Sequence, residues 1–121
     1  MTNISKSPGK ILGIDYGSIR IGIALSDITR TIAFGREVLE NNPGVLKSLL
    51  KIIRDEDVKE IVIGYPLNMK GERSKQTIEV ENFEKTLKDF LTKQKIEVNI
   101  VRWDERLTSI MAQKSIITSM T

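Results

Sequence analysis

Short apolar runs and longer amphipathic stretches alternate along this chain, and the two patterns predict strands and helices respectively. Residues 11–14 form an apolar strand that ends at Asp15. A tight glycine-containing turn follows, and residues 20–25 return as a second strand rich in small and β-branched side chains. A third strand is predicted over residues 31–39, with Gly35 at a bulge or bend. Three strands that follow one another so closely are predicted to be antiparallel.

The second half of the chain alternates helices with strands. Asn42 precedes a proline, which predicts a helix capped by Asn42 with the proline at its first position. Ser74 is predicted to cap a longer helix. Residues 61–63 are continuously apolar and residues 98–103 lack clean alternation, as is typical of parallel strands buried on both faces. A last helix is predicted from Ser109 on, capped by the preceding threonine.

This order of elements predicts an α/β fold. Three strands, a helix, a strand, a helix, a strand and a helix form a mixed five-stranded sheet with helices on both faces. The expected strand order is 3-2-1-4-5. A chain of 121 residues is long enough for one core, so residues 1–121 are predicted to form a single domain.

Composition narrows the chemistry. The chain has no cysteine and no histidine, which excludes disulfides, thiol catalysis and imidazole bases. A metal site therefore has to use oxygen ligands, which suit Mg²⁺ or Mn²⁺. A net charge of +3 permits a polyanionic partner without requiring one. The chain shows neither a membrane-spanning run nor a signal peptide, so no membrane association and a cytoplasmic location are expected.

Candidate catalytic groups lie where the predicted parallel strands end. Asp15 ends the first strand, residues 64–68 follow the fourth, and Asp104 and Glu105 follow the fifth. Ligands gather at the carboxyl ends of such strands. The first and fifth strands would lie about 10 Å apart, so their carboxylates can share two divalent ions about 4 Å apart. Alternatively, Asp15 is an ordinary turn residue and residues 104–106 are a solvated charged turn.

Basic residues occur near the same edge of the sheet. Lys70, Arg73 and Lys75 form a loop that can hold backbone phosphates, or an ordinary exposed loop. Arg20 can pair with a carboxylate or a phosphate, or form a surface salt bridge of little energetic value.

Three motifs together resemble the YqgF/RuvX family of RNase H-like proteins. They occur in the order GIDYGSIRIGIALSD, IVIGYPLNMKGE and DERLTS and span nearly the whole chain. The resemblance implies a divalent-metal nuclease of precursor 16S rRNA or of Holliday junctions. It further implies that Asp15 is the first metal-binding acid and Glu105 the second, with Asp104 as the fallback. The candidate nucleic-acid contacts are Arg20, Lys70, Arg73, Lys75 and Arg106.

One motif of the family is absent from these 121 residues. Relatives usually continue to a further helix that carries an Asp followed shortly by Ala-Ala, the third acid, and the sequence to Thr121 contains no such motif. The expectation is a single RNase H-like domain lacking the usual C-terminal helix. The source of a third acid stays open.

Four functional hypotheses follow from these features. The leading one is a metal-dependent endonuclease that acts on structured RNA and processes the 5′ end of pre-16S rRNA in ribosome biogenesis. A Holliday junction resolvase-like DNA nuclease and a non-catalytic nucleic-acid-binding module are the alternatives. A sugar-kinase or actin-like ATPase opens with a similar strand, Asp and glycine turn, but such proteins need two domains of this size. The oligomeric state is left open.

Overall fold

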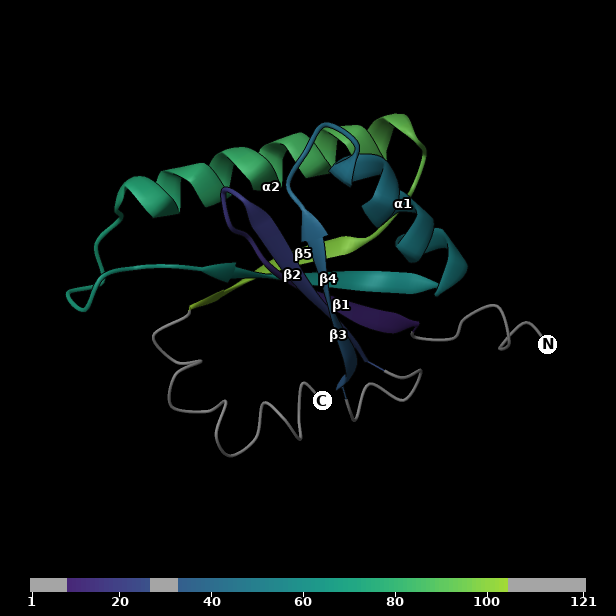
Figure 1. Cartoon of the computed structure of the whole chain (residues 1–121), viewed down its shortest axis with the longest axis horizontal. Helices are drawn as coiled ribbons and strands as arrows, with labels where there is room; N and C mark the ends of the chain where they lie inside the picture. Colours follow the sequence, from purple (N-terminus) through teal and green to yellow (C-terminus); the bar gives the residue numbers. More distant parts are fainter. Residues whose placement is uncertain (1–8, 27–32, 105–121) are drawn as a thin grey trace.

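A five-stranded sheet carries both described helices on one of its faces (Figure 1). The computed structural model describes residues 9–26 and 33–104. In chain order the elements are β1 (Lys10–Asp15), β2 (Arg20–Ser26), β3 (Ala33–Glu40), α1 (Val45–Asp55), β4 (Val58–Tyr65), α2 (Lys75–Lys93) and β5 (Asn99–Asp104).

The strand order is β3-β2-β1-β4-β5, which confirms the prediction. β1, β2 and β3 pair in antiparallel fashion, since short connections join them. β4 pairs in parallel with β1 on one side and with β5 on the other. Parallel neighbours need a crossover connection, and α2 supplies it between β4 and β5. The carboxyl ends of β1, β4 and β5 therefore meet at one edge of the sheet.

Gly35 lies at a bulge in β3, as predicted. Ala24 of β2 pairs with Arg36, whereas the next residue, Leu25, pairs with Phe34. Gly35 is thus the extra residue of the bulged strand, which increases the local twist.

The predicted start of the first helix was wrong by two residues. α1 begins at Val45 with Gly44 as its N-cap, and no side chain caps it. The Asn42 side-chain oxygen instead accepts a hydrogen bond from the backbone N–H of Gly44 at 3.0 Å. Asparagine readily bonds its own backbone two residues on, and here this local turn precedes the helix instead of capping it.

Ser74 caps α2, as predicted, and the capping contacts also fasten α2 to the end of β4. The Ser74 hydroxyl accepts from the backbone N–H of Thr77 at 3.3 Å, and the Thr77 hydroxyl accepts from the backbone N–H of Ser74 at 2.9 Å. The buried Thr77 hydroxyl also donates to the carbonyl of Pro66. Both ends of the β4–α2 loop are therefore held together.

The core lies between the two helices and the sheet face that they cover. Alternate strand residues point into it and meet the apolar stripes of α1 and α2. The buried set includes Leu12, Ile14, Ile21, Ile23, Ile61 and Ile63 from the sheet and Leu49, Ile53, Phe83, Leu87 and Leu91 from the helices. No helix in the described part of the chain is long and apolar enough to cross a membrane.

The other face of the sheet differs from the prediction in one respect. Ile61 and Ile63 are fully buried, but Val62 between them is only partly buried. Burial of residues 61–63 on both faces is therefore incomplete. Helices on both faces stay a prediction, because the helix expected from Ser109 on lies outside the described residues.

We expect Leu87→Ala to lower the free energy of unfolding by about 2–5 kcal/mol, the range for deleting a fully buried leucine side chain. Urea denaturation followed by circular dichroism measures the change. Lys88→Ala, at the exposed next position of α2, is the control and should stay within about 0.5 kcal/mol of the wild type. Equal losses in both variants would contradict this description of the core.

Candidate functional site

Asp15 ends β1 on the face of the sheet that α1 and α2 do not cover. Leu12 and Ile14 are buried under the helices, whereas Asp15 is exposed. Successive side chains of a strand point to opposite faces, so the core positions of β1 direct the Asp15 carboxylate away from the helices. In the described part of the chain, no hydrogen bond or ion pair engages this carboxylate.

Glycines lie on both sides of Asp15 in the sheet. Gly22 of β2 is its register partner. On the other side, Ile14 pairs with Ile63 of β4. The strands are parallel, so one residue further along both of them Asp15 lies beside Gly64. A Cβ atom added at Gly22 would lie 3.7 Å from the Cβ of Asp15. The carboxylate therefore has no side chain of an adjacent strand beside it, which leaves room for a hydrated cation or a phosphate group.

The hairpin turn after Asp15 is tightly built. A Cβ atom at Gly17 would lie 2.5 Å from the carbonyl oxygen of Arg20, so this position requires glycine. The side chain of Asn41 donates a hydrogen bond to the carbonyl of Gly17 at 2.9 Å. The Tyr16 ring packs on the helix side against Phe83, with ring centroids 4.7 Å apart. These contacts fix the backbone on which Asp15 stands.

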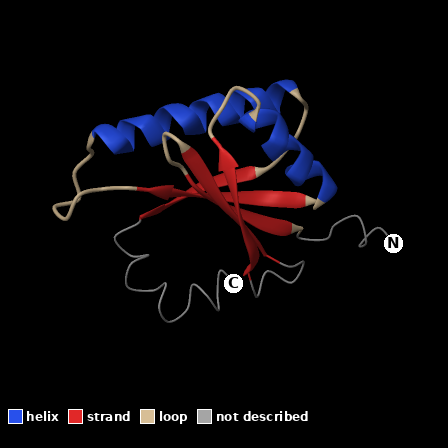
Figure 2. Ribbon diagram, in the orientation of Figure 1, coloured by secondary structure: helices blue, strands red, loops and turns tan. Residues whose placement is uncertain are grey.

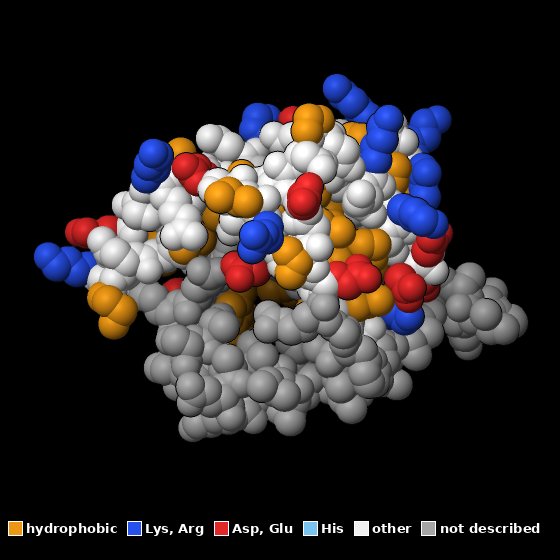
Figure 3. Space-filling view, in the orientation of Figure 1, with side chains coloured by type: hydrophobic (Ala, Val, Ile, Leu, Met, Phe, Trp, Pro, Cys, Tyr) orange, Lys and Arg blue, Asp and Glu red, His pale blue; other side chains and the backbone are white. Residues whose placement is uncertain are grey.

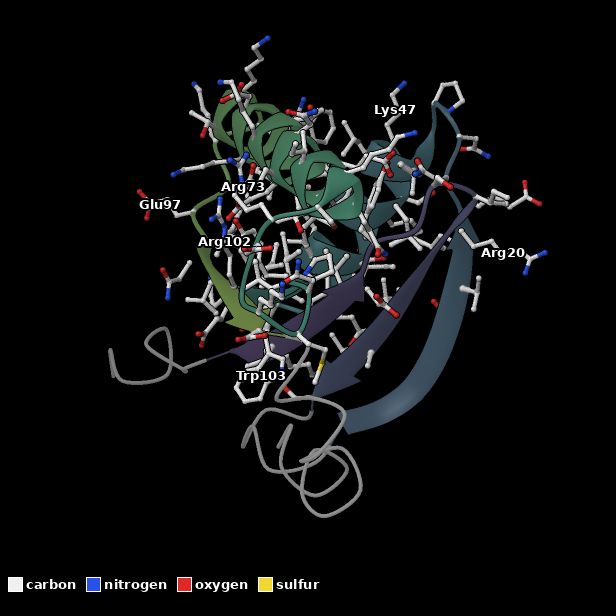
Figure 4. All side chains as sticks on the ribbon, turned by 90° about the vertical axis from the view of Figure 1, so that its left-hand side faces the viewer. Arg20, Lys47, Arg73, Glu97, Arg102 and Trp103 are labelled. Atoms are coloured by element: carbon white, nitrogen blue, oxygen red, sulfur yellow. The ribbon has the colours of Figure 1, made fainter. Side chains whose placement is uncertain are left out.

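Alternation along β5 separates the candidate acids. Trp103 pairs with Gly64 and so shares the face of Asp15, two strand spacings or about 10 Å away. Asp104 pairs with Tyr65, whose hydroxyl contacts α2, so Asp104 belongs to the helix-covered face. Figure 4 shows the corresponding separation of Arg102, toward α2, from Trp103 on the other side. Glu105 and Arg106 lie outside the described residues.

The basic candidates lie on two sides of Asp15. Arg20 is exposed at the start of β2, and strand alternation places it on the same face of the sheet as Gly22. Figure 4 shows it pointing away from the body, far from Arg73 and Arg102. Lys70 and Lys75 are exposed in and just after the loop that follows β4. The structure therefore brings these cations to the same edge of the sheet without clustering them.

Arg73 is engaged within the protein. Its guanidinium pairs with Glu81 of α2 through two contacts, at 2.6 and 3.1 Å. The Tyr65 hydroxyl donates to the same carboxylate at 2.5 Å. These hydrogen bonds, that of Arg73 first, lower the pKa of Glu81, while the bond to Glu81 raises the pKa of Tyr65.

A second ion pair lies next to this network. Arg102 of β5 pairs with Glu84 at 2.7 Å and stacks over the Tyr65 ring at 4.5 Å.

Sequence reasoning missed Glu81 and Tyr65, because helical periodicity places Glu81 on the polar face of α2. The spacing of Glu81 and Glu84, which lie on one side of a helix, was the available signal.

Of Asp15 and Glu105, the two acids predicted to bind a metal, only Asp15 lies among the described residues. Within residues 9–26 and 33–104, no three acidic side chains come together. Mg²⁺ is commonly held by only one or two carboxylates, with waters and substrate phosphates as the remaining ligands. The isolated, exposed carboxylate of Asp15 between two glycines fits that mode of binding.

Comparison with known proteins identifies the family. The RuvX family model, described as Holliday junction resolvase, matches residues 9–121. The chain belongs to the RuvX family. A protein from Ruminiclostridium cellulolyticum named "Putative pre-16S rRNA nuclease" is 40% identical over 109 residues, which cover 88% of this chain and 73% of that relative. A Roseiflexus protein of the same name is 36% identical over 116 residues, covering 94% and 79%.

A solved structure supports the fold of this RuvX chain. RuvC of Thermus thermophilus, in complex with a Holliday junction substrate, superposes with a TM-score of 0.59 over 86% of this chain and 70% of that one. The identity is 11%, so the likeness concerns the fold alone. The predicted RNase H-like fold and the predicted family are both confirmed.

We expect the Arg73–Glu81 network to make stability depend on acid pH. The pKa of Glu81 is lower in the folded chain than its ordinary value of 4.5. Its stabilising contribution is therefore present above about pH 4.5 and is lost as the pH falls through the folded-state pKa. The melting temperature of Glu81→Gln should lie below that of the wild type at pH 7, and the gap should narrow as the pH falls below about 4.5.

Thermal unfolding at a series of pH values measures that gap. Glu79→Gln, two residues earlier in α2 and outside the network, is the matched control and should show no such pH-dependent gap. A gap for Glu81→Gln that stays constant down to pH 3 would contradict the assignment.

Proposed function

We propose that this chain is a metal-dependent endonuclease that hydrolyses phosphodiester bonds in structured RNA, and that it processes the 5′ end of precursor 16S rRNA. The observation that carries this proposal is the placement of Asp15. An exposed carboxylate lies between two glycines where β1 and β4 end, on a fold in which ligands gather at such strand ends. The names of the curated relatives support RNA as the substrate.

Asp15 and Glu105 are the proposed metal-binding acids, with Mg²⁺ or Mn²⁺ as the ion. Glu105 follows β5 directly in the sequence, and the resemblance to the family implies a metal-binding role for it. The register of Asp104 with Tyr65 favours Glu105 over Asp104 for this role. A divalent ion bound there supplies an activated water and stabilises charge on the leaving oxygen.

The remaining polar residues have proposed roles in binding. Arg20, on one side of Asp15, and Lys70 and Lys75, on the other, are exposed and contact backbone phosphates. Arg106 is proposed for the same role from its place in the sequence. Arg73 forms two contacts with Glu81, so we assign it to positioning the loop. Action on precursor rRNA places the protein in ribosome biogenesis in the cytoplasm.

Asp15→Asn is expected to reduce cleavage of a precursor 16S rRNA 5′ fragment by about 100-fold or more, since even a group that only supports a metal ligand contributes about 10–100-fold. Single-turnover cleavage on denaturing gels measures the rate. Asp89→Asn makes the same chemical change at an exposed ion pair of α2 and should leave the rate unchanged. Equal rates for the wild type and Asp15→Asn would overturn the assigned role of Asp15.

We expect calorimetry to detect Mn²⁺ binding to the wild-type chain and a loss of that binding in Asp15→Asn and in Glu105→Gln. Both variants remove a negatively charged oxygen ligand while keeping the side-chain shape. Asp89→Asn again serves as the control. If the wild type binds RNA but no metal at millimolar concentration, the chain is a non-catalytic nucleic-acid-binding module and the proposed activity is wrong.

The family description favours a second candidate function, resolution of branched DNA. Competition between a precursor rRNA fragment and a four-way DNA junction for the same chain separates the two. Preferential cleavage of the RNA supports the proposal, whereas preferential cleavage of the junction supports the alternative.

A further inference from the structure

The loop between β4 and α2 projects from the body of the protein at the edge of the sheet that carries Asp15 (Figure 2). Met69 stands near its tip and is 88% exposed, the largest value among the exposed large hydrophobic residues that the structure describes. Lys70 follows directly and is also exposed. In the space-filling view, hydrophobic, basic and acidic side chains lie together at this extremity (Figure 3).

Asn68 organises the tip of the loop. Its side-chain oxygen accepts hydrogen bonds from the backbone N–H groups of Lys70 and Glu72, both at 2.9 Å. Its backbone N–H donates to the carbonyl of Glu72 at 3.0 Å, and its carbonyl accepts from Gly71 at 2.8 Å. Gly71 has a φ of +80°, a conformation that favours glycine. Met69 is therefore presented by an ordered turn.

The base of the loop is fastened to the body of the protein. Leu67 and Arg73 form an isolated antiparallel bridge across it. Arg73 is held in turn by Glu81, and Thr77 is bonded to the carbonyl of Pro66. Contacts at the tip and at the base together make the loop a rigid finger, which we define as residues 66–74.

Exposure of a single hydrophobic side chain is ordinary and by itself implies nothing. Here, however, the hydrogen bonds of the tip hold Met69 in an ordered turn, directly before the exposed Lys70. The nearby acid, Glu72, is engaged by the Asn68 amide at 3.1 Å. The tip of the finger thus presents an apolar side chain next to one exposed lysine, a combination that can pack on a base and contact a neighbouring phosphate.

We propose that Met69 is a wedge that packs against a base at the point where base stacking in the substrate is interrupted, while Lys70 contacts a neighbouring phosphate. This inference rests on the proposed function, because it takes a nucleic acid as the substrate. Methionine is among the side chains that insert between base steps, and its polarisable thioether packs well on aromatic rings. The finger thereby recognises structure in the nucleic acid without reading its sequence.

The geometry limits how far cleavage lies from the wedge. Four residues lie between Gly64, the neighbour of Asp15, and Met69, so the Cα atoms of Gly64 and Met69 are five steps and at most about 18 Å apart. The cleaved phosphate and the interrupted stack therefore belong to the same local region of the substrate.

The test uses two RNAs that carry 2-aminopurine at the same position, one in a continuous duplex and one beside a junction between duplex and single strand. Wild-type chain is expected to raise the fluorescence of the junction RNA, because a wedge unstacks the probe. Met69→Ala should abolish that rise and weaken binding of the junction RNA about tenfold, as expected for the loss of one stacking contact. Its affinity for the continuous duplex should not change.

Three controls separate this role from others. Met69→Leu retains an apolar wedge and should keep the fluorescence rise. Ile78→Ala removes another exposed apolar side chain, on α2, and should behave like the wild type. Lys70→Ala should weaken binding of both RNAs alike, because a phosphate contact is independent of stacking.

The outcomes distinguish the inference from the proposed function. If Met69→Ala gives the wild-type fluorescence and affinity on the junction RNA, the wedge is wrong and the nuclease proposal stands. If the wild type binds neither RNA, both are wrong. A rise that is lost in Met69→Ala and kept in Met69→Leu supports the wedge, whether or not cleavage is observed.

Discussion

The strict alternation of side chains along β1 is the constraint on which the rest of this structure depends. Leu12 and Ile14 have to enter the core, because the parallel partners Ile61 and Ile63 and the stripes of α1 and α2 meet them there. The next residue, Asp15, is then directed to the opposite face. A shift by one residue would bury the carboxylate and expose the leucine and isoleucine, so the core itself fixes the register of the site.

The candidate site also depends on the absence of side chains at the two positions next to Asp15 in the sheet. Gly22 and Gly64 flank Asp15 in the two neighbouring strands, and both positions face away from the helices. In the middle of a sheet, glycine lowers stability and marks a place where another group approaches closely. The sheet thus keeps an open position around one carboxylate, at the edge where three strands end.

Charged residues near this edge divide into two groups with different tasks. Arg73 and Arg102 are paired with Glu81 and Glu84 and connect β4, β5 and α2 through the Tyr65 side chain. Lys70 and Lys75 are exposed and extend toward solvent. The paired arginines give the finger its fixed base, so the lysines and Met69 are carried by a rigid support. Membership in the RuvX family is consistent with an edge built to meet an extended polyanion.

Local sequence patterns determined much of this protein. The hairpin, the bulge at Gly35 and the cap at Ser74 follow from apolar periodicity and turn residues, which act between near neighbours in the chain. The motifs around Asp15 and after β5 also identified the family. The start of α1 was misplaced, because an asparagine accepts the same kind of backbone hydrogen bond in a turn as in a helix cap, and Asn42 accepts it in a turn.

Only the tertiary structure decided which residues share a face and which charges are already paired. Alternation places the adjacent positions 103 and 104 on opposite faces, and the register of β5 with β4 decides that position 103 shares the face of Asp15. The sequence alone suggests that Arg73 is an unpaired cation. In the structure it pairs with Glu81, which lies eight residues later on α2. Contacts of this kind arise when separate elements pack together, so no local pattern encodes them.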